Sequence, residues 1–247
     1  MMMVLGAVGF FHPGLVSLWN PVAANVPAHE LLLHLIAIIA MATGAGLLFQ
    51  RGAAIAASLL LATLLLWLLL LRLPNFLVEP LFAACWSVFP LLFMVSAAWV
   101  LYVWFAAAWQ RNHLGFISGN YGLRIARSLY GLSLIFFGTA HFIDVKDTVS
   151  LIPHWLPAHL FLAYFTGCAF IAAGLAALTG FCARLAVTLS AIQIALFLFL
   201  VWIPIVAAGS KNPFQWSETI LNAALCAGAW VMTDSYRHAP WLIAKNR

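Results

Sequence analysis

Two segments of the chain place histidines beside carboxylates at spacings that suit chemistry. The residues are His29, Glu30 and His34 in the first segment, and His141, Asp144, His154, Trp155 and His159 in the second. Imidazole exchanges protons near neutral pH and is a common ligand of transition metals and haem iron. The two segments therefore predict a site for proton transfer, or for a bound transition metal or haem.

Glu30 and His34 are four residues apart, so on a helix they share a face. A hydrogen bond between the two side chains would satisfy an imidazole that lies in an apolar stretch and would keep it basic. We expect Asp144 to orient His141 in the same way. The predicted catalytic residues are His34, His141, Glu30 and Asp144; the predicted cofactor-binding residues are His29, His154, His159 and Trp155; the predicted metal ligands are His29, His34, His141 and His159.

Each of these patterns also has a purely structural explanation. Histidines at a membrane interface can cap helices and meet water, and Glu30 and His34 can be a self-satisfied polar pair. Glu79 and Glu218 each open an expected helix, where a carboxylate is favoured by the helix dipole whatever the function. The aromatic residues Trp86, Phe89, Trp202 and Phe214 could line a slot for a flat quinone ring, or could simply pack in a core.

Composition limits the class of protein. Apolar residues make up 66% of the 247 residues and charged residues only 7%, which predicts a polytopic membrane protein. The net charge of +5 is spread thinly over loops and does not indicate a nucleic-acid partner. The four cysteines form no CxxC pair, and no nucleotide-binding or hydrolase motif is present. We expect the lipid bilayer to be the main partner.

Eight apolar stretches predict an all-helical fold with eight transmembrane spans. They are residues 1–12, 28–49, 53–73, 81–106, 127–143, 158–179, 184–207 and 217–234. The first is short for a bilayer about 30 Å thick, so it is either a partial span shielded by its neighbours or the end of a span that starts upstream. Prolines at 80 and 90 predict a kink or an interfacial lead-in in the fourth.

The basic residues predict the orientation in a bacterial-type inner membrane. With both termini in the cytoplasm, the positive-inside rule is obeyed by eight basic residues against three. The eight are Arg51, Arg111, Arg124, Arg127, Arg184, Arg237, Lys245 and Arg247, and the three are Arg72, Lys146 and Lys211. Six histidines and five of the six carboxylates then fall on the outer side, where we expect imidazoles from both halves to converge in one pocket.

Similar marks recur in the two halves of the chain. The marks of the first half are Gly9 to His12, Pro27-Ala28-His29, Gly44 and Leu73-Pro74; those of the second are Gly138 to His141, Pro157-Ala158-His159, Gly174 and Ile203-Pro204. The offset is 129 residues at the first mark and 130 at the others, which predicts two parallel four-helix repeats. We expect repeats at 1–108 and 127–234, a cytoplasmic linker at 109–126 and a tail at 235–247. His34 aligns with Tyr164, which disfavours a symmetric two-metal site.

The second half resembles the DoxX-like family of small four-helix membrane proteins. The resemblance rests on Gly138-Thr139-Ala140-His141-Phe142, on the Pro153 and Pro157 pair, on Gly167 and on the basic turn at Arg184, and it covers residues 127–234. Residues 1–105 resemble a degenerate second copy that keeps His12, Pro27 and Gly44. The resemblance implies a link to quinones or to thiosulfate oxidation, because members of the superfamily include DoxD and MauE.

The function expected from these patterns is that of a redox-associated membrane protein. It would be linked to a quinone, or be a subunit of a respiratory or sulfur-oxidising assembly with other membrane or periplasmic redox subunits. An alternative is a non-catalytic scaffold or assembly subunit that packs on partner helices. A carrier for a small solute is disfavoured, because the inner half offers few polar residues beyond Ser133, Ser190 and Gln193.

Overall fold

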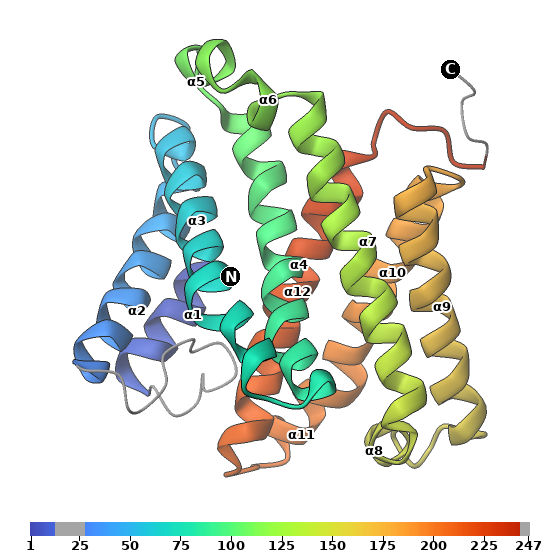
Figure 1. The fold of residues 1–247 in the computed structure, drawn as a ribbon. Helices are drawn as coiled ribbons and strands as arrows, with labels where there is room; N and C mark the ends of the chain where they lie inside the picture. Colours follow the sequence, from blue (N-terminus) through green and yellow to red (C-terminus); the bar gives the residue numbers. More distant parts are fainter. Residues whose placement is uncertain (13–27, 243–247) are drawn as a thin grey trace.

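The computed structural model describes residues 1–12 and 28–242, and all regular elements within these ranges are helical (Figure 1). This confirms the predicted all-helical class. The α-helices are α1 Met2–Phe11, α2 His29–Gly46, α3 Ala53–Trp67, α4 Leu81–Phe105, α5 Ala108–His113, α6 Gly115–Ser118, α7 Asn120–Ile143, α8 Val145–Leu151, α9 His159–Thr179, α10 Ala183–Phe197, α11 Ile203–Ala207 and α12 Pro213–Ser235. Pro27, Lys245 and Arg247 lie outside the described residues.

Three shorter helices complete the list. They are the π-helical turns η2 Leu68–Arg72 and η4 Leu198–Trp202 and the 3₁₀ helix η3 Leu73–Leu77. The turns η2 and η4 continue α3 and α10 without a break and re-aim each helix before a proline.

Five helical segments within the described ranges are long and apolar enough to cross a membrane: α2, α3 with η2 and η3, α4, α9, and α10 with η4 and α11. A sixth is formed if α7 and α8, which meet at an angle of 92°, make one bent span. The other two expected spans are α1, which has only ten residues, and α12, which carries Glu218, Asn222 and Asp234. The membrane environment is therefore supported by five or six helices rather than eight.

The helices run between two ends of the molecule, which we name after the short helices found there. At the α5 end lie α5, α6 and the α2–α3 and α9–α10 connections (Figure 1). At the α8 end lie the start of α2, η3, α8 and α11 (Figure 1). The basic and acidic residues separate between these ends as the sequence predicts, because Arg51, Arg111 and Arg184 lie toward the first and Glu30, Glu79 and Asp144 toward the second.

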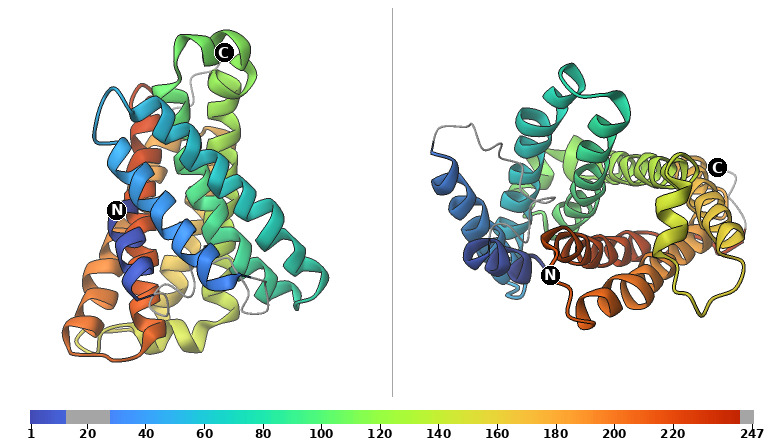
Figure 2. Two further views of the ribbon diagram at one scale, coloured as in Figure 1. Left: turned by 90° about the vertical axis from the view of Figure 1, so that its left-hand side faces the viewer. Right: turned by 90° about the horizontal axis from the view of Figure 1, so that it is seen from below.

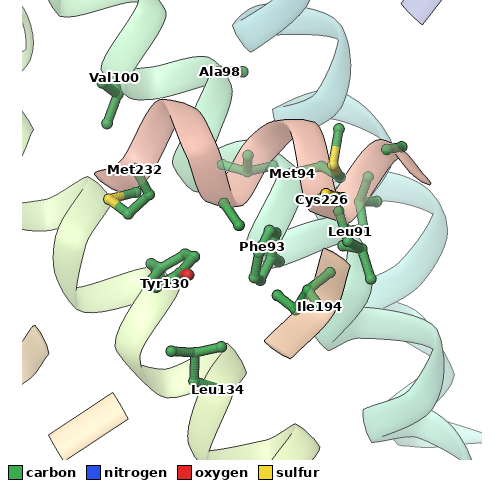
Figure 3. Packing of buried hydrophobic residues seen from close by; sticks show 14 of the residues in the cluster. Leu91, Phe93, Met94, Ala98, Val100, Tyr130, Leu134, Ile194, Cys226 and Met232 are labelled. Atoms are coloured by element: carbon green, nitrogen blue, oxygen red, sulfur yellow. The ribbon is translucent and has the colours of Figure 1, made fainter. Parts of the chain in front are cut away.

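Helices α4, α7, α10 and α12 share the main apolar core. Phe93 of α4, Tyr130 of α7, Ile194 of α10 and Met232 of α12 are all buried in it (Figure 3). Helices α1 to α3 lie to one side of this core and α9 to the other (Figure 2). Tyr130 shares a hydrogen bond of 2.9 Å with Ser190, so its hydroxyl is satisfied within the core.

Glycines bring the backbones of α7 and α9 into direct contact. A Cβ atom added at Gly138 would lie 2.5 Å from the carbonyl oxygen of Gly167, and one at Gly174 would lie 2.5 Å from that of Gly131. No real Cβ approaches so closely, so these positions require glycine, as is usual where small residues let membrane helices pack. Gly6 and Gly44 do the same between α1 and α2.

Several local features repeat at an interval of 130 residues. Ala28 and Ala158 both have left-handed backbone conformations, with φ of 57° and 54°, and each precedes the histidine that begins a helix. The π-helical turns η2 and η4 are also 130 residues apart, and each is followed by a proline, Pro74 or Pro204. The two halves therefore share unusual backbone geometry and not only sequence marks.

The first helices of the two halves correspond with a register that differs from the sequence match. Gly6 meets Ala37 and Met41 of α2 as Gly138 meets Gly167 and Ile171 of α9, an offset of 132 rather than 129. The ring pairs Phe10–His34 and Phe142–Tyr164 obey the same offset. His12 therefore corresponds to Asp144, since both residues end their helices, and not to His141 as the motif match suggested.

We expect Gly174→Ala to lower the free energy of unfolding by about 1–3 kcal/mol, because the new methyl group must push α7 and α9 apart. Thermal unfolding of the detergent-purified protein measures the change. Gly115→Ala on α6 is the matched control, since nothing lies within 4 Å of its added Cβ. Equal stability of the two variants would show that the α7–α9 contact is looser than described.

Candidate functional site

The predicted site residues fall into two groups that the structure keeps apart. His29, Glu30 and His34 lie at the start of α2, while His141 and Asp144 lie at the end of α7. Figures 1 and 2 show these two places on opposite sides of the α8 end, with α4 and α12 between them. The imidazoles of the two halves therefore do not converge in one pocket.

The four predicted metal ligands, His29, His34, His141 and His159, are not assembled into a metal site. Across residues 1–12 and 28–242, no group of three or more His, Cys, Asp or Glu side chains is placed to hold a metal ion. The nearest approach is that of His154 and His159, whose ring centroids are 6.4 Å apart in the α8–α9 connection. His159 also bonds to the carbonyl oxygen of Pro153 through Nε2, at 3.2 Å, and the neighbouring Trp155 is 70% exposed.

His34 is held by the backbone of its own helix rather than by a carboxylate. Its Nδ1 lies 2.6 Å from the carbonyl oxygen of Glu30, whereas the Glu30 side chain is exposed. A carbonyl four residues back lies within reach of the ring and needs no second side chain to be ordered, so it competes well with the carboxylate. The expected side-chain pair of Glu30 and His34 is corrected accordingly.

His141 has the same backbone bond in a more enclosed setting. Its Nδ1 lies 2.8 Å from the carbonyl oxygen of Phe137. Its ring stacks on Phe197 of α10 at 5.9 Å and meets Phe170 of α9 edge-on at 5.6 Å. The expected bond to Asp144 is not formed, because Asp144 ends α7 at the sharp turn into α8.

This arrangement fixes the chemistry that His141 can perform. A carbonyl only accepts hydrogen bonds, so Nδ1 carries the proton and Nε2 keeps its lone pair. Within the described ranges, Nε2 of His141 has no hydrogen-bond partner. A neutral imidazole with a free lone pair, set between aromatic rings, can accept a proton or a hydrogen bond from a ligand.

Glu218 and Asn222 were not predicted as site residues. Glu218 was expected to cap a helix, but α12 begins at Pro213 and its cap is Asn212, whose side chain accepts from the amide of Phe214. Glu218 therefore lies beyond the first turn. Asn222 lies one turn further on, and its Oδ1 is buried without a hydrogen-bond partner. The spacing of four residues on one helix was the sequence signal that could have found this pair.

Comparison with known proteins assigns no family to the chain. No protein-family model, no curated protein and no solved structure matches it. The DoxX-like resemblance remains a prediction from the order of the motifs. Two of the residues that carry it are in contact, because a Cβ added at Gly167 would lie 2.9 Å from Cβ of His141.

We expect ¹⁵N NMR of histidine-labelled protein to show the Nδ1–H tautomer for both His34 and His141 at neutral pH, because both rings donate to a carbonyl. Glu30→Gln should leave the His34 signals unchanged, since the backbone rather than the carboxylate holds the ring. A shift of the His34 signals in that variant would restore the side-chain pair.

Proposed function

We propose that this chain is a redox-associated integral membrane protein that binds a quinone in the half formed by α7 to α12. The observation that carries the proposal is the environment of His141. Its unpartnered Nε2 lies among Phe170 and Phe197, close to the α8 end of the bundle. A quinone is flat and uncharged and takes up protons with its electrons, so aromatic walls and an imidazole suit it.

A quinone suits the described residues better than the transition metal or haem that the histidines first suggested. A metal site needs several converging ligands, and His141 is a single imidazole bounded by hydrocarbon rings. One imidazole is sufficient to hydrogen-bond the oxygen of a quinone. The proposal therefore assigns binding to His141 and gives no metal role to His29, His34 or His159.

The proposal includes the duplicated topology. Two parallel four-helix repeats, related to the DoxX-like family, would each contribute four spans, with α1 and α12 shielded by their neighbours. The matched left-handed alanines, π-helical turns and prolines support this arrangement. The concentration of arginines at the α5 end supports a cytoplasmic position for that end, with His141 toward the outer face of an inner membrane.

We expect detergent-purified protein to bind a short-chain quinone, and His141→Phe to weaken the binding about tenfold, the loss of one hydrogen bond to an imidazole. Quenching of tryptophan fluorescence measures the affinity, and solvent extraction measures quinone retained from the membrane. His34→Phe is the control, because His34 has the same backbone bond but lies on the peripheral helix α2.

The same sample should be examined by visible spectroscopy and metal analysis. Equal quinone affinity in wild type and His141→Phe would remove His141 from the site. Protein that binds no quinone, absorbs no visible light and holds no metal would favour the alternative, a non-catalytic subunit that packs on partner helices.

A further inference from the structure

Two polar residues of α12 lie inside the bundle without partners. Within the described residues, Glu218 makes no hydrogen bond or ion pair, and Oδ1 of Asn222 is fully buried and unbonded. Leaving a buried carbonyl unpaired costs about 1–3 kcal/mol, and a carboxyl group costs more. Ionisable groups at such depth in a membrane protein are rarely retained without a function.

The contacts of α12 show which way this pair faces. Gly228 marks the row of residues that packs on α4, since an added Cβ would meet Phe93 and Ala97. Thr219 and Thr233 mark a second row, because they donate to the carbonyls of Trp202 and Val187, both at 3.4 Å.

At 3.6 residues per turn, Glu218 and Asn222 fall between these two rows. Cys226, one turn beyond Asn222, lies among core residues of α4 and α10 (Figure 3). The exposed residues Trp216 and Trp230 lie on the far side of the helix. The pair therefore faces the interior between α4 and α10, and not the surrounding lipid.

The same two threonine bonds fix the depth of the pair. They set α12 antiparallel to α10, with Asn222 close to the level of Leu198. Leu198 directly follows Phe197, on which the ring of His141 stacks. Glu218 lies about 5.4 Å, one helical turn, nearer the α8 end. Groups from α12 and α7 thus approach the same aromatic region from different helices.

The chemistry of the pair defines the ligand. A carboxylate and an amide carbonyl both accept hydrogen bonds, and no donor of the described chain pairs with either. Their partner must therefore bring its own donors, and it must be apolar enough to enter the core. A hydroquinone has hydroxyl groups on a flat ring, whereas the oxidised quinone has acceptors only.

We propose that Glu218 and Asn222 accept hydrogen bonds from a hydroxyl group of a hydroquinone and so make the site selective for the reduced ring. This inference rests on the quinone-linked function proposed above and names the ligand form that its second wall recognises. It adds Glu218 and Asn222 to the binding residues.

The experiment compares the affinities for a short-chain hydroquinone, kept reduced under anaerobic conditions, and for its quinone. Glu218→Leu and Asn222→Leu should each weaken hydroquinone binding about tenfold and quinone binding far less. Glu79→Gln is the matched control, because Glu79 is exposed just before α4 and faces no core. It should change neither affinity.

Stability without ligand separates a binding role from a structural one. Glu218→Leu and Asn222→Leu should melt at or above the wild-type temperature, since each removes an unpaired buried polar group. A lower melting temperature in both would make the residues structural and overturn the inference. Wild-type binding of both ring forms with unchanged hydroquinone affinity in the variants would also overturn it, while leaving the quinone function intact. Wild-type protein that binds neither form would end both.

Discussion

The direct contact between the backbones of α7 and α9 determines where His141 lies. Gly167 has no side chain, so Cβ of His141 can approach α9 to a distance that any other residue there would forbid. The ring is then directed past Phe170 toward Phe197 of α10. Because Nδ1 is already bonded to Phe137, only Nε2 is left for other chemistry. A packing constraint between two helices thus decides both the place and the tautomer of the candidate proton acceptor.

The sequence predicted the helices well because apolar length is a strong signal in membranes. It predicted the sorting of charges between the two ends for the same reason. It could not predict how His34 and His141 are held, because a carbonyl of the same helix is invisible in a list of side chains and outcompetes Glu30 or Asp144. Spacing along a helix shows which side chains can meet, but not which acceptor has the lower entropic cost.

The register of α1 shows a different limit. Gly6 and Gly9 are three residues apart and lie on nearly the same face, so either could serve as the contact with α2. The motif match paired Gly9 with Gly138, whereas the contacts pair Gly6 with Gly138. A shift of one turn keeps the apolar face inward, so hydropathy does not oppose it. It nevertheless changes which polar residue reaches the end of the helix, and His12 takes the place of Asp144 rather than that of His141.

The two halves differ most at the level of Glu218 and Asn222. If the match of Trp99 with Trp230 is continued along α4 and α12, their counterparts are Ser87 and Leu91. Ser87 accepts a hydrogen bond from Asn75 at 3.0 Å and donates to the carbonyl of Ala84, and Leu91 is buried in the core. The first half therefore satisfies these positions from within, with one small hydroxyl and one apolar side chain. Because the same helical frame closes without unpaired acceptors there, the acceptors of α12 are not a requirement of the fold, and a ligand is the simplest reason for their presence.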